Sequence, residues 1–549
     1  MADRSPDKEA IVHWSAEKEP VRWAYGNLFS SAEAHAAALA DAGIRRGDVC
    51  ALIFRHHPDF YPLYIAVTVL GAVPSILAYP NARLHEDKFR QGIQGMAQNS
   101  GLDWILTERE LGPALEPLFE IQGSTIQGIH FPLDWKAQAG GRKGRRPRFK
   151  TRTGPRPGDP FLLQHSSGTT GLQKPVLLSH RAVWTHLKNY SKAIRLAKTD
   201  KVVSWLPLYH DMGLVAAFHL PLAFGIPSVQ IDPFEWVQAP ALLFQAVSRE
   251  KGTLSWMPNF AFNLMADRIH DEEMEGLSLE SWRMVINCSE PIREESRQKF
   301  VRRFCRYGLR KQAVSSCYAM AESTFAVTQT PPGREPATKI VDRRELAKGK
   351  AHGTGDASQG RVCVSSGTPI PGCRVRIVGN SGERLSEGRI GEVAIRSNSL
   401  FDGYRNYPRK TAEVLREGWY YSGDIGFFLS NEYFIIGRKK DVIIVGGQNL
   451  YPEDIENAVN EVPGVIPGRA VAFGKDDPDL GTEQVYVVAE TRLEDKIKRE
   501  ELRAEIRQAV SGIDVTLRKI YLVPPRWLIK SSAGKPGRKA NKERIRDDF

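Results

Sequence analysis

The first quarter of the chain, residues 1 to about 137, alternates between helical and strand patterns, and this alternation constrains the fold most. Residues 30–42 are rich in alanine and predict a helix, and the apolar run 49–54 predicts a buried strand. A helix over 63–70 and a strand over 73–77 repeat the unit. Repeated units of this kind are typical of an α/β fold with a mainly parallel sheet.

The length of the chain indicates more than one domain. It has 549 residues, 42% hydrophobic and 26% charged, so it can bury several cores. The apolar stretch 63–79 contains Gly71 and Pro74, which favours a buried helix and strand over a membrane span. Residues 1–7 lack the apolar run of a signal peptide. The 6 cysteines form no Cys-x-x-Cys pair, which argues against zinc and a disulfide framework, so a reducing cytoplasm fits best.

The net charge of +12 raises the question of a nucleic-acid partner. A good part of the excess lies in the run 142–152 and in the C-terminal tail. Because that run contains glycine and proline, we favour a solvated surface loop over an RNA-binding arm. On the RNA-binding interpretation, deletion of residues 142–152 would abolish function.

A loop of small, hydroxylated and glycine residues, 164–175, follows the apolar residues 161–163. Glycines let the backbone approach a ligand, hydroxyl groups hydrogen-bond and a lysine adds positive charge, which suits a polyphosphate. Leu172 and Gln173 stand before the lysine, so this is not a Walker A loop. An ordinary turn between two strands is the alternative. The expected phosphate-binding residues are Ser167, Gly168, Thr169, Thr170, Gly171 and Lys174.

Further motifs follow this loop in a fixed order. Residues 179–193 predict a helix, and 202–208 predict a strand that leaves its sheet at Pro207, where α/β proteins bind ligands. The loop and the later motifs together resemble the signatures of the adenylate-forming, acyl-activating superfamily. The later motifs occupy residues 205–214, 287–291, 317–322, 418–424, 437–441 and 531–535. The resemblance implies a large N-terminal domain of layered α/β sheets with a β-barrel-like subdomain, and a small, mobile α+β C-terminal domain.

The resemblance also implies a reaction. A carboxylate attacks the α-phosphorus of ATP, pyrophosphate leaves and an acyl-AMP remains, which requires neutralised phosphates and close positioning of two anions. Lys535 resembles the family's mobile catalytic lysine, which bridges the carboxylate and the α-phosphate. Glu322 would hold Mg²⁺, with Thr170 as a helper, because a hard cation suits oxygen ligands. His210 stands where the family closes the acyl pocket, and a buried structural histidine is the alternative.

The remaining site residues are assigned by the same resemblance. Tyr318 offers a ring face for adenine, Asp424 can accept both ribose hydroxyls, and Arg438 can donate to the ribose or a phosphate. A core tyrosine and a surface ion pair are the alternatives for these residues. The other expected nucleotide-binding positions are Ser289, Glu290, Pro291, Cys317, Ala319, Met320, Ala321 and Ile436, and the expected acyl-pocket residues are Trp205, Asp211 and Phe260.

Within the superfamily, an extra segment that includes residues 340–350 resembles the insertion of the fatty acyl-AMP ligases. In that family the insertion is thought to restrain the domain movement needed for coenzyme A chemistry, so the resemblance implies transfer to the phosphopantetheine of an acyl carrier protein. The short stretch 413–422 is more like an acyl-CoA synthetase that uses free coenzyme A, and the insertion could be a plain surface hairpin. A non-catalytic binding protein of the same fold is a more remote alternative.

The motifs also suggest how the chain divides. We expect an N-terminal adenylation domain over 1–437, a hinge over 438–440 with Lys440 as its central residue, and a mobile domain over 441–549 that carries Lys535. Helices are predicted over 452–459 and 496–511. A medium- or long-chain fatty acid is the expected substrate, with aryl and amino acids left open.

Overall fold

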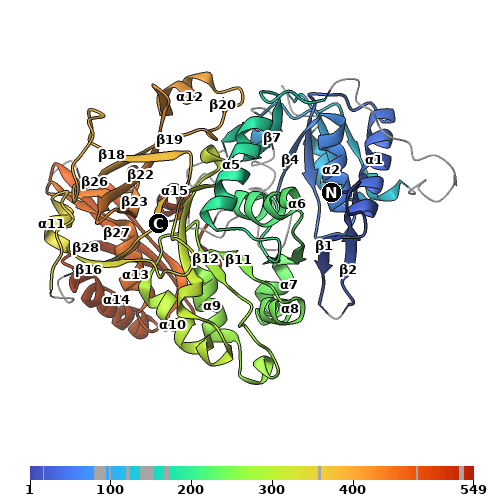
Figure 1. The fold of residues 1–549 in the computed structure, drawn as a ribbon. Coiled ribbons are helices and arrows are strands. Elements are labelled where there is room, and N and C mark those ends of the chain that lie inside the picture. Colours follow the sequence, from blue (N-terminus) through green and yellow to red (C-terminus); the bar gives the residue numbers. More distant parts are fainter. Residues whose placement is uncertain are drawn as a thin grey trace, which may run out of the picture.

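The computed structural model describes residues 1–16, 18–79, 94–97, 100–118, 124–135, 154–165, 174–355, 360–477, 480–530 and 537–548. In Figure 1 the blue N-terminal part lies at one side of the molecule and the orange and red C-terminal part at the other. The mixed α/β class predicted from the alternating patterns is confirmed.

A parallel four-stranded sheet in the order β4-β3-β5-β6 forms the first repeated units. Helix α1 buries Leu28, Ala32, Ala36 and Leu39, which share one face of the helix. The apolar stretch 63–79 supplies most of α2 and all of β4, both buried, as expected. Among the described residues, no helix combines the length and the apolar character that crossing a membrane requires. The elements are α1 (Tyr25–Asp41), β3 (Val49–Ile53), α2 (Phe60–Leu70), β4 (Val73–Ile76), β5 (Trp104–Thr107), α4 (Gly112–Leu115) and β6 (Gly128–His130).

A nine-stranded sheet in the order β17-β14-β13-β12-β11-β9-β10-β1-β2 forms the centre of the molecule. Its strands from β13 to β1 are parallel, and the two edges are antiparallel. The strand predicted over 202–208 ends at Ser204, because the chain turns away before Pro207. The strands are β1 (Glu9–Trp14), β2 (Val21–Ala24), β9 (Val202–Ser204), β10 (Ser228–Ile231), β11 (Leu254–Met257), β12 (Met284–Asn287), β13 (Val314–Ala319), β14 (Ala326–Gln329) and β17 (Thr368–Pro369).

Helices between these strands cover the sheet, and their residues form one large core with the strands. Helix α5 begins where predicted, with Ser179 as N-cap accepting from the Ala182 amide. After β9 the chain forms a π-helical segment, η5 (Met212–His219), whose residues are all buried. The helices are α5 (His180–Ala193), α6 (Leu220–Phe224), α7 (Pro233–Gln238), α8 (Leu242–Glu250), α9 (Asn259–Arg268) and α10 (Glu294–Phe304).

Antiparallel strands build the region between the large sheet and the C-terminal part, where the barrel-like subdomain was expected. A five-stranded sheet runs β18-β19-β22-β21, with β23 also paired to β22, and a three-stranded sheet runs β20-β8-β7. The extra segment forms the hairpin β15–β16 with α11 between its strands. The elements are β7 (Pro160–His165), β8 (Pro175–Ser179), β15 (Thr338–Asp342), α11 (Arg343–Ala347), β16 (Gly360–Val364), β18 (Cys373–Val378), β19 (Gly391–Ser397), β20 (Gly403–Tyr404), α12 (Pro408–Val414), β21 (Leu415–Arg416), β22 (Trp419–Leu429) and β23 (Glu432–Arg438).

The residues after β23 have a core of their own, centred on Ile455, Val459, Leu502 and Ile506. Both predicted helices are present: α13 begins at Pro452 with two acidic residues in its first turn, and α14 spans the predicted range. A three-stranded sheet β26-β27-β28 packs against them. The elements are β24 (Ile443–Val445), β25 (Gln448–Leu450), α13 (Pro452–Asn460), β26 (Val465–Asp477), β27 (Thr482–Thr491), α14 (Lys496–Ser511), β28 (Leu517–Val523) and α15 (Arg538–Asp548).

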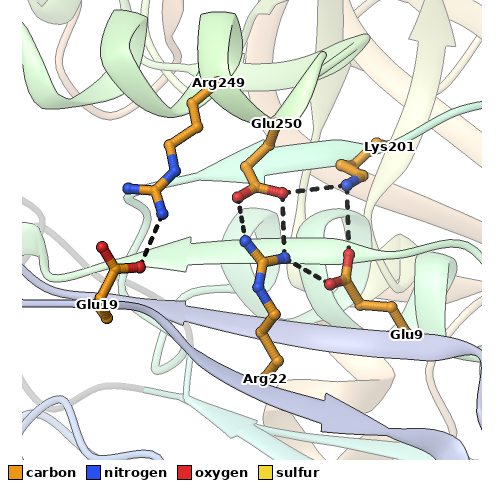
Figure 2. A network of polar contacts seen from close by, with 6 residues as sticks. All are labelled: Glu9, Glu19, Arg22, Lys201, Arg249 and Glu250. Carbon is orange, nitrogen blue, oxygen red and sulfur yellow. Dashed lines mark hydrogen bonds and ion pairs between the residues drawn. The ribbon is translucent and has the colours of Figure 1, made fainter.

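An ion-pair network fixes the edge strand β2 to the large sheet (Figure 2). Arg22 on β2 donates to Glu250 Oε1 of α8 and to Glu9 Oε2 of β1, each at 2.5 Å. Lys201 lies 3.2 Å from both carboxylates. Burial alone would raise the pKa of Glu250, but the hydrogen bonds from Arg22 and Lys201 outweigh it and lower that pKa below its ordinary value.

Candidate functional site

Three predicted nucleotide-binding residues meet at one point. Asp424 on β22 faces Arg438 on β23 in the strand register, and Tyr318 projects from the end of β13. The Tyr318 hydroxyl donates to Asp424 Oδ2 at 2.5 Å, and Arg438 Nε lies 3.1 Å from Oδ1. Burial, together with the charge of Asp424, raises the pKa of Tyr318 well above its ordinary value. The cluster therefore offers a carboxylate, a phenol ring and a guanidinium to one ligand.

A second group joins the predicted metal-binding carboxylate to the lysine of the phosphate loop. Glu322 is buried, and its Oε1 accepts from the hydroxyl of Tyr404 at 2.6 Å. Lys174 Nζ lies 3.4 Å from the same hydroxyl and 4.8 Å from the centre of the Tyr404 ring. Tyr420 approaches the hydroxyl at 3.5 Å. A single buried carboxylate beside a lysine fits Mg²⁺, which takes one or two protein carboxylates and completes its shell with phosphate and water.

Several of the predicted site residues lie outside the described residues. These are Ser167, Gly168, Thr169, Thr170, Gly171 and Lys535. The base of the phosphate loop is described: β7 and β8 are antiparallel, and His165 pairs with Pro175. His165 is held between Ser75 Oγ at 3.1 Å and Ser100 Oγ at 2.9 Å, and burial lowers its pKa to about 4. A neutral histidine with two hydrogen bonds therefore fixes the start of the loop.

The segment after β12 is held in an unusual backbone conformation. Ser289 has a φ of +70°, which non-glycine residues rarely adopt outside functional or strained turns. The next residue, Glu290, accepts from the Phe260 amide at 3.0 Å and so connects the expected adenine side to the expected acyl side. Pro291 is exposed, and Cys317 is buried below Tyr318.

The remaining residues of the 317–322 motif, Ala319, Met320 and Ala321, are fixed by backbone hydrogen bonds and turns. The Met320 amide donates to the Phe325 carbonyl at 2.8 Å, and Ala321 opens a short helical turn that contains Glu322. Ala319 pairs with Ala326 across β13 and β14. Ile436 is buried on β23. Contact of these residues with a nucleotide stays a prediction.

Aromatic side chains dominate the region expected to receive the acyl group. Trp205 stacks on Trp236 with ring centres 3.5 Å apart and planes 5° from parallel, and Phe260 contacts both edge-on. Phe260 is 40% exposed, whereas both tryptophans are buried. A role for Trp205 and Phe260 in the acyl pocket stays a prediction, and Trp236, which comes from α7, belongs to none of the sequence motifs.

The turn between β9 and η5 orders the other two candidates of that motif. His210 is half-buried and packs against Tyr209 with ring centres 4.7 Å apart. Asp211 Oδ1 accepts from the Met212 amide at 2.8 Å, so this carboxylate caps η5. A Cβ atom at Gly213 would lie 2.4 Å from the Pro207 carbonyl oxygen, so only glycine fits this turn. Roles for His210 in catalysis and Asp211 in the acyl pocket stay predictions.

The predicted hinge residue contributes charge to the site. Part of the Lys440 side chain is exposed, yet desolvation of its ammonium group by the surrounding protein lowers its pKa to about 8. The positive charges of Arg438 and Lys174 lower that pKa further. Three cationic side chains therefore share one electrostatic environment beside Asp424, which suits a polyphosphate.

One more lysine with a lowered pKa, Lys530, lies in the C-terminal part of the chain and was not singled out from the sequence. Lys530 Nζ donates to the Gly468 carbonyl at 2.8 Å. Burial and the charge of Arg469 lower its pKa to about 8, while the carboxylates of Glu490 and Glu290 partly oppose this.

The chain is similar to known proteins in sequence and in overall fold. Residues 1–405 match the family model described as AMP-binding enzyme. The chain is 30% identical over 584 residues to the long-chain-fatty-acid-AMP ligase FadD26 of Mycobacterium bovis, covering 100% of this chain and 96% of that one. It is 29% identical over 523 residues to the 4-hydroxyphenylalkanoate adenylyltransferase of Mycobacterium tuberculosis, covering 91% and 82%. A solved structure from studies of fatty acyl-adenylate ligases of E. coli and L. pneumophila superposes with a TM-score of 0.89 at 26% identity, covering 98% and 95%.

Proposed function

Because the chain belongs to the AMP-binding enzyme family, we propose that it is a fatty acyl-AMP ligase that activates a medium- or long-chain fatty acid with ATP. The acyl group then passes to the phosphopantetheine of an acyl carrier protein. The observation that carries the proposal is the contact of Tyr318, Asp424 and Arg438, which brings residues of three motifs into one cluster. A cytoplasmic location is part of the proposal, since the cysteine pattern suits a reducing compartment.

Acyl-AMP formation follows from the charges of the site. A carboxylate oxygen bonds to the α-phosphorus, the bond from that phosphorus to the β-phosphate oxygen breaks, and pyrophosphate leaves with the electron pair. Lys174, Arg438 and Lys440 offset the phosphate charge, and Asp424 fixes the ribose. Mg²⁺, held by Glu322 and Thr170, would neutralise further phosphate charge. Lys535 bridges the two reacting anions in this proposal.

The second step releases AMP. The thiol sulfur of phosphopantetheine bonds to the acyl carbonyl carbon, the bond to the AMP oxygen breaks, and the thiol proton passes to solvent. In the proposal, rotation about 438–440 removes the C-terminal domain from its adenylation position before this step.

Contacts of the inserted hairpin support a carrier protein as acceptor. Arg361 on β16 donates to the Ile436 carbonyl at 2.9 Å and lies 3.1 Å from Asp454 Oδ1 on α13. Its guanidinium also lies 5.1 Å from the centre of the Tyr451 ring. The hairpin thus bonds to residues on both sides of the proposed hinge, which would restrain rotation toward a coenzyme A-competent arrangement.

The test is ATP/pyrophosphate exchange with a panel of carboxylic acids, comparing wild type with Lys535→Ala. We expect fatty acids of one length class to drive exchange in the wild type, and the variant to lose it. Addition of coenzyme A or of a holo-carrier protein then identifies the acceptor, and we expect product only with the carrier. Exchange with no acid would refute the ligase, and rapid acyl-CoA formation would favour the acyl-CoA synthetase alternative.

A further inference from the structure

A buried asparagine joins the two chain segments that flank residues 531–536. The Gly537 amide donates to the Ile529 carbonyl at 2.9 Å. Asn541 accepts from the Ile529 amide at 2.8 Å and donates to the carbonyls of Ile529 and Gly537, both at 2.9 Å. Its side chain is fully buried. One side-chain amide therefore connects Ile529 and Gly537, the described residues near the two ends of this segment. We call Ile529, Gly537 and Asn541 the frame.

An arginine in the first turn of α15 ties the same frame to the residues that follow the proposed hinge. Arg538 Nη1 donates to Asp441 Oδ2 at 2.8 Å. Its Nε and Nη2 donate to the two oxygens of Glu456 at 3.0 and 2.8 Å, and Nη2 lies 3.0 Å from Glu453 Oε1. Asp441 directly follows Lys440, and both glutamates lie on α13.

Lys535 lies outside the described residues, but its distance along the chain from Gly537 is known from the sequence. It precedes Gly537 by two residues, and two residues of chain span at most about 7 Å. Whatever fixes Gly537 therefore restricts the position of the Lys535 backbone. Among the partners of Asn541 and Arg538, Ile529 and Gly537 flank the lysine segment and Asp441 is the first residue after the proposed hinge.

We propose that Asn541 and Arg538 are positioning residues for acyl-AMP formation, because they fix the base of the segment that carries Lys535 to the residues next to the hinge. This proposal rests on the proposed function. Rotation at 438–440 then moves the lysine as part of one rigid frame, so its place relative to the α-phosphate depends on both side chains.

The first test separates the two half-reactions of Asn541→Ala. We expect kcat for ATP/pyrophosphate exchange to fall about 100-fold, the effect of a misplacement of roughly 1 Å, with little change in the KM for ATP. Transfer from supplied acyl-AMP to the acceptor should stay within about twofold of wild type. The matched control is Thr491→Ala, which truncates a buried side chain in the same part of the chain. The Thr491 hydroxyl is hydrogen-bonded to Gly464 and Leu493, and neither residue belongs to the frame. This variant should lower the melting temperature without lowering exchange.

A double-mutant cycle tests whether Asn541 acts through Lys535. If it does, Asn541→Ala causes no further loss of residual exchange in a Lys535→Ala background. Equal fold-losses in both backgrounds, or equal losses in both half-reactions, would overturn the positioning role. Absence of exchange in the wild type would instead refute the proposed function itself.

Arg538→Lys keeps the test decisive if Asn541→Ala does not fold. Lysine retains the positive charge among three carboxylates but cannot reproduce the forked bonds to Asp441 and Glu456. We expect a selective fall in exchange kcat with transfer retained. An Arg538→Lys enzyme that folds and exchanges at the wild-type rate would contradict the proposal.

Discussion

At the scale of single residues, Asp424 is the central residue of the proposed nucleotide site. Its two oxygens are bonded to Tyr318 and Arg438, so it sets the position of both. Asp424→Asn removes the charge that Arg438 faces, and we expect kcat/KM for ATP to fall about 100-fold in exchange assays. Tyr318→Phe, which keeps the ring face and loses only the hydroxyl bond, should lose roughly tenfold. Equal effects of the two substitutions would contradict this ranking.

Lys440 predicts a pH dependence of nucleotide binding. Its pKa is about 8, and Arg438, Lys174, Asp441 and Asp424 are the charged groups that act on it. The side chain is charged below that pH and neutral above it, so the KM for ATP should rise several-fold as the pH rises from about 7 to about 9. Lys440→Arg stays charged across this range, and its KM should not follow the same rise. A parallel rise in both proteins would assign the titration to another group.

The sequence predicted which motif residues would meet, but not what connects them. Tyr318, Asp424 and Arg438 belong to motifs whose order indicated one site. Tyr404 and Trp236 belong to none, because their importance arises only from contacts made across the fold. A linear pattern shows periodicity and local chemistry, whereas such contacts depend on how sheets and turns pack.

At the scale of elements, the edge strand β2 depends on the network around Glu250. The side chain of Glu250 is only 5% exposed, and we expect Glu250→Gln to lower the free energy of unfolding by about 1–3 kcal/mol near pH 7. Glu19→Gln removes the partner of Arg249 at a carboxylate that is 88% exposed, and it should cost less than about 1 kcal/mol. Urea unfolding of both variants measures the difference, and similar losses would contradict it.

The same network predicts how the stability difference between wild type and Glu250→Gln depends on pH. The folded-state pKa of Glu250 lies below its ordinary value of 4.5, so the unfolded chain takes up this proton first as the pH falls. The stabilisation is therefore fully present above about pH 5 and is lost as the pH falls through the lowered pKa. The difference in free energy of unfolding between wild type and Glu250→Gln, measured by urea unfolding, should therefore become smaller as the pH is lowered.

Elements with strong local signals were predicted well. Helix α14 matches its predicted range, because Asp495 caps it and an apolar face runs through Leu502, Ile506 and Val510. The strand predicted over 202–208 was too long, since an apolar run does not reveal where its neighbours stop pairing. Helix α1 begins at Tyr25, before the alanine-rich stretch, because Tyr25 and Leu28 are buried against the rest of the fold.

At the scale of the whole molecule, the contacts of Arg361 predict acceptor choice. Arg361→Ala removes the bonds from the inserted hairpin to Ile436 and Asp454, and we expect coenzyme A to become an acceptor at a rate at least about tenfold above wild type, with exchange unchanged. Val362→Ala, on the same strand at an exposed position, is the matched control and should not change acceptor choice. A folded Arg361→Ala enzyme that still rejects coenzyme A would show that the hairpin does not set this choice.

The overall class was predictable from alternation and motif order, but the sheet order was not. Nothing in residues 9–14 indicates that this strand lies beside β10, since parallel neighbours separated by a long stretch of chain leave no local signal. The domain division at 438–440 and the rotation about it stay predictions, because they require a second orientation of residues 441–549 relative to residues 1–437.

The position of β1 has a consequence for synthesis of the protein. Ile11 pairs with Ser228, so the first strand leaves the ribosome about 220 residues before its inner neighbour is made. At roughly 5–20 residues per second, that delay is about 10–40 s. During this time the apolar side chains of Ile11, Val12 and Trp14 lack their partners in the large sheet, and β2 is the nearest strand in the chain that pairs with β1. Burial of these side chains in the large sheet therefore waits until residue 231 has emerged.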